Sequence, residues 1–218
     1  MALAIFDLDN TLIANDSDYL WGEFVCEQEL VDVETYRKGN AYFHQQYEQA
    51  SLDIYEYLNF ALEPLTRYSM DELKQYHELF MDQHIRPIML EKARILLQKH
   101  RNRGDHLMII TATNRFVVEP IADEFGVDTL LAIELEIKNN RYTGKVTGTP
   151  TFQDGKVTRL QEWLTENPGF SMEGSYFYSD SKNDLPLLQK VDFPFAVNPD
   201  PELEKTAREN DWPVLNLR

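Results

Sequence analysis

The stretch Phe6-Asp7-Leu8-Asp9-Asn10-Thr11-Leu12 follows a short apolar run, residues 2–6, which has the composition of a buried strand. Asp7 and Asp9 are two positions apart, so in an extended chain their side chains point to the same side. Two carboxylates held together repel each other unless a cation or a proton relieves the repulsion. Asp and Asn also suit helix caps and turns, which is the alternative interpretation of the pair. Its place at the tip of an apolar strand favours a chemical site.

The composition restricts the class of partner. The chain has 218 residues and a formal net charge of -16 at pH 7, which disfavours binding to nucleic acid or to anionic membranes. No apolar run approaches the roughly 18 residues of a membrane span. The N-terminus lacks the basic stretch and cleavage site of a secretory signal. We therefore expect a cytoplasmic protein that acts on a small molecule, and the sequence does not indicate its oligomeric state.

Residues 14–85 differ in composition from the rest of the chain. They contain 15 Asp and Glu against 4 Lys and Arg, and 13 of the 26 aromatic residues. Their pattern predicts helices that begin at the caps Asp16 or Ser17, Asp32 and Ser69. The expected helices cover residues 17–30, 33–50, 53–64 and 71–83. Four helices with short connections indicate a small bundle inserted into the chain.

The remaining residues, 1–13 and 86–218, alternate between apolar strands and helices, with a hairpin that turns at Asn139-Asn140. The expected strands cover residues 2–6, 106–110, 131–138, 141–147, 175–178 and 193–197. The expected helices cover residues 87–103, 115–125, 156–167 and 184–190. This order predicts an α/β core domain, a Rossmann-like and mostly parallel sheet with helices on both faces, and the bundle 14–85 as an inserted helical cap domain.

Sheets of this type bind ligands at the carboxyl ends of their strands. Three expected strands end at Asp7, Thr111 and Asp180, so we expect these residues to meet at one edge. Clustered carboxylates without a Cys or His group favour a hard cation such as Mg²⁺. A threonine hydroxyl, the ammonium of Lys156 and free backbone N–H groups at Leu8 and Asp9 suit a phosphate.

Four separated motifs resemble those of the haloacid dehalogenase superfamily, in the same order. They are Asp7-Leu8-Asp9-Asn10-Thr11, the strand end Ile109-Ile110-Thr111, Lys156 at a helix start, and Ser179-Asp180-Ser181-Lys182-Asn183-Asp184. The helical insertion after the first motif resembles the phosphoserine phosphatase-like branch, which includes histidinol-phosphate phosphatases. The resemblance extends over essentially the whole chain.

The resemblance implies a magnesium-dependent phosphomonoesterase. Asp7 would attack phosphorus and form an aspartyl-phosphate, and Asp9 would protonate the leaving alcohol and then activate water. Mg²⁺ would be held by Asp7, the backbone carbonyl of Asp9 and Asp180, with Asp184 orienting its waters or Lys156. The groups expected to hold the phosphate oxygens are the Leu8 and Ala112 N–H groups and the side chains of Thr111, Lys156 and Asn183.

The acidic, aromatic insert indicates a cationic substrate. Phosphoserine phosphatases carry an acidic residue nine positions after the nucleophile, here Asp16, and an Arg in the insert for the substrate carboxylate, which has no evident counterpart in this chain. Asp16 and Asp18 could bind an ammonium, while Tyr19, Trp21 or Phe24 could stack on a ring or a cation. The leading substrate hypothesis is L-histidinol phosphate. The alternatives are a phosphoserine phosphatase, a phosphotransferase that uses an acceptor alcohol, and a catalytically silent binding protein.

Overall fold

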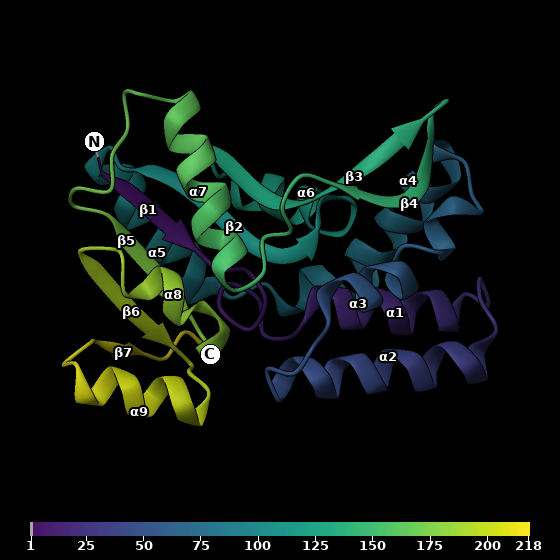
Figure 1. The fold of residues 1–218 in the computed structure, drawn as a ribbon, viewed down its shortest axis with the longest axis horizontal. Coiled ribbons are helices and arrows are strands. Elements are labelled where there is room, and N and C mark those ends of the chain that lie inside the picture. Colours follow the sequence, from purple (N-terminus) through teal and green to yellow (C-terminus); the bar gives the residue numbers. More distant parts are fainter. Residues whose placement is uncertain (1) are drawn as a thin grey trace.

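The computed structural model describes residues 2–218, which fold around a seven-stranded sheet (Figure 1). The strands are β1 (Leu3–Phe6), β2 (His106–Asn114), β3 (Thr129–Lys138), β4 (Arg141–Thr147), β5 (Tyr176–Ser179), β6 (Phe193–Val197) and β7 (Val214–Leu215). Their order is β4-β3-β2-β1-β5-β6-β7, and neighbours are parallel except in the β3–β4 hairpin. The predicted α/β fold with a mostly parallel sheet is confirmed.

Helices cover both faces of this sheet, as expected. On one face, α5 (Glu91–Arg103) and α6 (Arg115–Phe125) belong to the apolar cluster that contains Ala4 and Phe6 of β1. On the other face, α7 (Asp154–Glu166), α8 (Leu185–Leu188) and α9 (Pro201–Glu209) belong to the cluster that contains Leu3 and Ile5. Successive residues of a strand point to opposite faces, so burial of both faces explains why β1 is apolar throughout.

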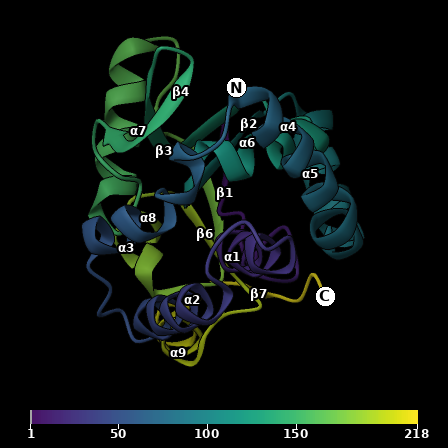
Figure 2. The ribbon, with the colours of Figure 1, turned by 90° about the vertical axis from the view of Figure 1, so that its right-hand side faces the viewer.

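The insert contains α1 (Ser17–Glu27), α2 (Val33–Glu48), α3 (Ile54–Ala61) and α4 (Met70–Phe80). In Figure 1 these helices lie beyond the carboxyl end of β1, and Figure 2, seen from their side, shows α1 and α2 next to each other. Three of the helices begin at the predicted caps Asp16, Asp32 and Ser69, whose side-chain oxygens accept backbone N–H groups. We propose that residues 14–85 form a cap domain over the strand ends.

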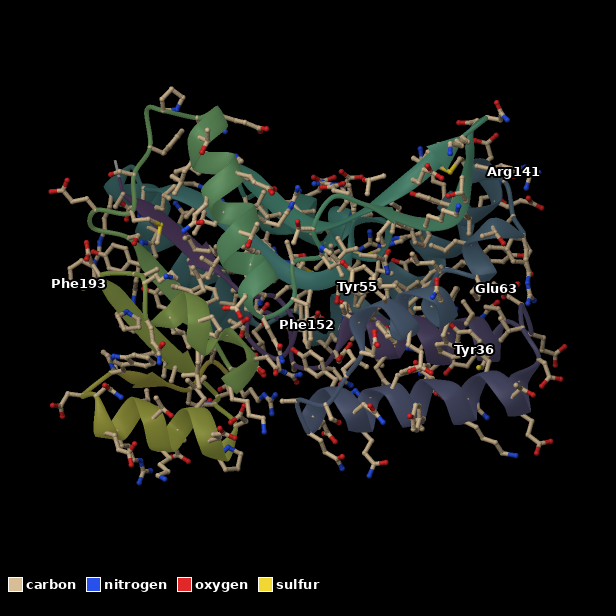
Figure 3. All side chains as sticks on the ribbon, viewed as in Figure 1. Tyr36, Tyr55, Glu63, Arg141, Phe152 and Phe193 are labelled. Atoms are coloured by element: carbon tan, nitrogen blue, oxygen red, sulfur yellow. The ribbon has the colours of Figure 1, made fainter. Side chains whose placement is uncertain are left out.

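The β3–β4 hairpin reaches from the sheet over the helices of the insert (Figure 1). Arg141, labelled in Figure 3, lies at the tip of this hairpin. Asn139 and Asn140 both have positive φ, 52° and 57°, as the predicted two-residue turn requires. The ring of Tyr142 in β4 packs 5.6 Å from that of Phe116 in α6. Strand β4 also contacts the 3₁₀ turn Pro64–Thr66 and α3, so the hairpin supports the insert from outside residues 14–85.

Several helix and strand boundaries differ from the expectation. Pro87 lies in a 3₁₀ turn, Arg86–Ile88, and α5 begins only at Glu91 because Met89 and Leu90 are extended. Strand β2 continues past Thr111 to Asn114, and α7 begins at Asp154, two residues before Lys156. The terminal elements α9 and β7 were not predicted. Within residues 2–218, none of the helices combines the length and the hydropathy needed to cross a membrane.

Candidate active site

The first motif forms a tight turn at the end of β1. The backbone N–H of Asp7 donates to the Tyr178 carbonyl of β5 at 2.9 Å, so pairing continues to the last residue before the turn. The N–H groups of Thr11, Leu12 and Ile13 then all donate to the Leu8 carbonyl, at 3.3, 2.8 and 3.2 Å. Asn10 takes the left-handed conformation that the turn needs, with φ 55°. This turn keeps Asp7 at the sheet edge, only 4% exposed.

Lys156 links Asp7 to the fourth motif. Its Nζ lies 2.7 Å from Asp7 Oδ1 and 2.7 Å from Asp184 Oδ1. Burial opposes the charge of Lys156, but Asp184 and Asp7 together raise its pKa above the usual range. The Ser179 hydroxyl donates to Asp184 Oδ2 at 2.7 Å and fixes that carboxylate. Lys156 is therefore a buried ammonium held between two carboxylates.

The start of α7 places Lys156 through a close approach at Gly155. A Cβ on Gly155 would lie 2.0 Å from the Pro150 carbonyl oxygen, so no other residue fits without a shift of the backbone. The residue before the helix, Gln153, has φ 49°, and its side-chain amide donates to Asn183 Oδ1 at 3.3 Å. The local sequence thus determines where the ammonium of Lys156 lies.

Asp180 follows β5 and adds a third, partly buried carboxylate. Its Oδ1 accepts the Thr11 hydroxyl at 3.1 Å. Burial, followed by the charges of Asp7 and Asp184, raises the pKa of Asp180 well above its ordinary value. Burial also raises the pKa of Asp7 to about 6; Lys156 acts to lower it and Asp184 to raise it. Negative charge around Lys156 therefore exceeds what one ammonium neutralises.

This donor set fits a hard divalent cation. The carboxylates of Asp7 and Asp180 supply oxygen ligands, and the Asp9 carbonyl accepts no hydrogen bond from residues 2–218. Within the same residues, no group of three or more His, Cys, Asp or Glu side chains is arranged to hold a metal without other donors. A cation here would therefore need the backbone carbonyl and water or substrate oxygens as further ligands, which is the coordination that Mg²⁺ accepts.

Asp9 is held at both of its carboxyl oxygens. Oδ1 accepts the Ser17 N–H of α1 at 2.6 Å, and the Thr113 hydroxyl of β2 lies 2.9 Å from Oδ2. Burial, followed by the charges of Asp16 and Asp7, raises the pKa of Asp9 well above its ordinary value, while the contacts with Ser17 oppose the rise. A raised pKa favours the protonated carboxyl, which can give its proton to a leaving oxygen.

Strand β2 is irregular where the expected phosphate ligands lie. Ile110 faces Leu131 and Asn114 faces Ile133, so three residues of β2 oppose one residue of β3. The bulge contains Thr111, Ala112 and Thr113, which all line the cavity described below. The Thr111 Oγ1 accepts the Thr113 N–H at 3.2 Å, so its own proton can be directed to another acceptor.

Asn183 lies at the same edge of the sheet, in the 3₁₀ turn Lys182–Asp184 that follows β5. Its Nδ2 donates to the Tyr47 carbonyl of α2 at 3.5 Å, a long contact between the fourth motif and the insert. Asn183 and Asp180 line a separate hollow that shares Asp16, His44 and Tyr47 with the cavity. The structure thus brings Asp7, Asp9, Thr111, Lys156, Asp180, Asn183 and Asp184 to one edge of the sheet.

A cavity with about 560 Å³ of empty space, part of it open to solvent, extends from Asp7 and Asp9 toward the insert. Asp16, Asp18 and Tyr19, which were expected to contact the substrate, line it. The lining residues that the sequence did not indicate are Asn40, Phe43, His44, Tyr47, Leu52, Ile54, Tyr57, Thr113 and Phe152. Phe152 lies between the sheet and the insert (Figure 3). In the described part of the chain, the lining includes no Lys or Arg.

Only one sequence signal could have found the missed residues. Asn40, His44 and Tyr47 recur at the spacing of one helix face, but the sequence does not tell which face of α2 meets the cavity. His44 has partners that explain its place: its Nδ1 is 3.7 Å from Asp16 Oδ2, and its ring is 4.6 Å from that of Tyr19. The nearby Asp16 carboxylate raises the pKa of His44, while burial opposes the rise.

The structure corrects the expectation for Trp21 and Phe24. Neither residue lines the cavity, and Trp21 is 3% exposed and Phe24 fully buried. The Trp21 ring lies 5.3, 5.2 and 5.0 Å from the rings of Phe24, Phe80 and Phe116, inside the apolar core. The reason is geometric, since two residues along a helix correspond to about 200° of rotation, and Tyr19 already faces the cavity.

The chain resembles known hydrolases over most of its length. A family model described as haloacid dehalogenase-like hydrolase matches residues 4–189. A histidinol-phosphatase of Neisseria meningitidis serogroup C (strain 8013) is 46% identical over 220 residues, which cover 99% of each chain. The crystal structure of a protein of unknown function from Bordetella pertussis Tohama I has a TM-score of 0.93 at 40% identity, with 100% and 99% of the two chains covered. A substrate-bound phosphoserine phosphatase shares the fold, with a TM-score of 0.72 at 17% identity and 98% and 92% coverage. The chain therefore belongs to the haloacid dehalogenase-like hydrolase family and is a phosphatase within it.

Proposed function

We propose that this phosphatase hydrolyses L-histidinol phosphate with Mg²⁺ through a phosphorylated Asp7. The main support for this chemistry is the buried contact of Lys156 with both Asp7 and Asp184, at 2.7 Å each. Asp7 and Asp9 line the same cavity. Lys156 favours the ionised form of Asp7, and burial favours the protonated form of Asp9. One carboxylate is thereby suited to attack and the other to donate a proton.

The reaction would proceed in two displacements at phosphorus. In the first, an oxygen of Asp7 bonds to phosphorus while the bond from phosphorus to the alcohol oxygen breaks, and Asp9 gives its proton to that oxygen. In the second, water attacks phosphorus, the bond from phosphorus to Asp7 breaks, and Asp9 takes a proton from the water. Free alcohol and inorganic phosphate leave, and both carboxyl groups return to their initial states.

The remaining residues of the edge would position the phosphate. Asp7, Asp180 and the Asp9 carbonyl would hold Mg²⁺, which when bound would neutralise phosphate charge. Lys156 and the Thr111 hydroxyl, with the N–H groups of Leu8 and Ala112, would contact phosphate oxygens. Asn183 would join them after exchanging its long contact with the Tyr47 carbonyl for a phosphate oxygen. Asp184 would keep Lys156 in place.

The cavity supports a cationic leaving group. It carries Asp16 and Asp18 and no Lys or Arg among the described lining residues, so a substrate carboxylate would find only His44 as a basic partner. An ammonium or an imidazole would find carboxylates and the rings of Tyr19, Phe43 and Tyr57. The relative from Neisseria meningitidis, 46% identical, is named histidinol-phosphatase. These observations favour L-histidinol phosphate over phosphoserine.

The proposal is tested with a substrate panel and one variant. Phosphate release is measured from L-histidinol phosphate, L-phosphoserine and p-nitrophenyl phosphate, with and without chelator and with added alcohols. We expect L-histidinol phosphate to give the highest kcat/KM and Asp7→Asn to lose at least about 1,000-fold in kcat. A higher kcat/KM for phosphoserine would refute the substrate, and alcohol phosphates as the main product would indicate a phosphotransferase. Full activity of Asp7→Asn would refute the mechanism, and an inactive wild type would favour the binding protein.

A further inference from the structure

We propose that Asp18 is the specificity-determining residue of the cavity, and that it selects phosphomonoesters whose alcohol carries a cationic nitrogen group such as imidazolium or ammonium. The inference rests on the proposed function, because it assumes that the alcohol part of the substrate occupies this cavity. It goes further by assigning recognition to Asp18, in place of Asp16, to which the family resemblance points.

Asp18 is a buried carboxylate without a cationic partner. It lines the cavity and is 9% exposed. The side chains that hydrogen-bond with it are neutral: the Asn114 amide donates to Oδ1 at 3.3 Å, and the Tyr57 hydroxyl is a further hydrogen-bonding neighbour. The nearest charged side chain, Asp16, is also a carboxylate. No Lys, Arg or His within residues 2–218 pairs with it. Buried charges are normally paired, so an unpaired carboxylate facing a cavity indicates a ligand that completes it.

Asp16 is already engaged by the protein. Its Oδ1 accepts the N–H groups of Asp18 and Tyr19, at 2.9 and 2.8 Å, as the N-cap of α1. Its Oδ2 lies 3.7 Å from His44 Nδ1. The cap and the histidine together use both oxygens of Asp16, whereas no cationic side chain within residues 2–218 pairs with Asp18. The two carboxylates therefore differ in role although both line the cavity.

Aromatic residues give the Asp18 end of the cavity a shape suited to a flat ring. Phe43 of α2 and Tyr57 of α3 lie with ring centroids 5.5 Å apart, and both line the cavity. A carboxylate beside aromatic faces binds a nitrogen cation through a charge-assisted hydrogen bond and cation–π contact. A substrate with a neutral alcohol part would leave the Asp18 carboxylate without a partner, and selectivity follows from that difference.

The test compares Asp18→Asn with Glu56→Gln, a matched loss of one negative charge from the exposed side of α3. For Asp18→Asn we expect kcat/KM for L-histidinol phosphate to fall about 10- to 100-fold, as the loss of a hydrogen bond to a charged group does. The same variant should change kcat/KM for p-nitrophenyl phosphate, which has no cation, by less than about 3-fold. The inhibition constant of L-histidinol against p-nitrophenyl phosphate should rise in parallel. Glu56→Gln should leave all three quantities unchanged.

Other outcomes of these measurements would overturn the role of Asp18 or move its test to ligand binding. An equal loss for both substrates would show that Asp18 supports the fold and would overturn the inference, as would an unchanged kcat/KM for L-histidinol phosphate. If the wild type cleaves only p-nitrophenyl phosphate, the proposed substrate fails, and Asp18 is tested by the inhibition constants of L-histidinol and histamine. If the wild type cleaves neither ester, the inference is tested by calorimetry, which compares the binding of L-histidinol and histamine to wild type and to Asp18→Asn. Equal binding by wild type and Asp18→Asn, or no binding to the wild type, overturns the inference.

Discussion

The ammonium nitrogen of Lys156 lies 2.7 Å from Oδ1 of Asp7, and both side chains are almost fully buried. Burial alone would favour a protonated Asp7, since it removes the carboxylate from water. Lys156 opposes this effect and is in turn kept charged by Asp184 and Asp7. The charge of the proposed nucleophile thus depends on one lysine from a distant helix, α7.

Replacement of Lys156 tests this dependence. Lys156→Met should lose at least about 1,000-fold in kcat, because both a phosphate contact and the charge partner of Asp7 disappear. It should also lower the free energy of unfolding by about 3 to 5 kcal/mol, since two buried carboxylates lose their counter-charge. Lys190→Met, on an exposed residue, is the control and should change neither. Phosphatase assays and urea unfolding measure the two effects, and wild-type kcat in Lys156→Met would contradict the assigned role.

Gly155 allows a second test, in which the ammonium is displaced but not removed. In Gly155→Ala the new Cβ would meet the Pro150 carbonyl oxygen at 2.0 Å, so the start of α7 must shift and carry Lys156 with it. We expect kcat to fall about 10- to 100-fold and the free energy of unfolding to fall by about 1 to 3 kcal/mol. Gly169→Ala, where a Cβ meets nothing within 4 Å, should behave as wild type in both measurements. Equal kcat values for the two variants would show that the helix start tolerates the shift.

The excess of carboxylates leads to a prediction about the metal. Binding of Mg²⁺ should relieve the repulsion among Asp7, Asp180 and Asp184, so Mg²⁺ should raise the Tm of the wild type even without substrate. Asp180→Asn removes one proposed ligand and should reduce this rise in Tm and increase the Mg²⁺ concentration for half-maximal activity at least about 10-fold. Glu56→Gln is the control for a general loss of charge. A Tm rise of equal size in wild type and Asp180→Asn would place the ion elsewhere.

The sequence was most informative where local chemistry fixes the backbone. The caps Asp32 and Ser69 and the Asn139-Asn140 turn involve groups within a few residues, and all three were predicted correctly. Asp16 was one of the two caps predicted for α1. The core of the site was predicted from strand ends, because parallel strands bring their carboxyl ends to one edge. The α/β class followed from the alternation of apolar strands and helices, and the inserted helices from their composition and caps.

What the sequence did not reveal depends on tertiary packing. Trp21 and Tyr19 are both aromatic residues of α1, and only the packing of that helix decides that Tyr19 lines the cavity while Trp21 joins the core. His44 and Tyr57 reach the cavity from α2 and α3, whose rotation about their axes is set by neighbouring helices. The bulge in β2 that contains Ala112 arises from irregular pairing with β3, which no local sequence pattern indicates. The two-residue strand β7 is too short to give a periodic signal.

Asp18→Asn should separate stability from selectivity. Burial raises the pKa of Asp18 to about 7; the Tyr57 hydroxyl opposes the rise and the charge of Asp16 adds to it. The other groups around it, Asn114 of β2 and Tyr36 of α2, are uncharged near neutral pH. A carboxyl group with a raised pKa in the folded state stabilises the protein below its unfolded-state pKa, and this stabilisation is lost as pH rises through about 7.

The ionised Asp18 carboxylate therefore lowers stability at pH 8, and its replacement by the neutral Asn should raise the free energy of unfolding there. At about 1.4 kcal/mol per pKa unit, we expect a gain on the order of 1 to 4 kcal/mol at pH 8 that becomes smaller toward pH 5. Urea unfolding at both pH values measures it, with Glu56→Gln as the exposed control that should show no gain. A variant that is less stable than wild type at pH 8 would mean that Asp18 is needed for packing. A more stable variant with lower kcat/KM for the cationic substrate would show that the carboxylate is retained for recognition at the expense of stability.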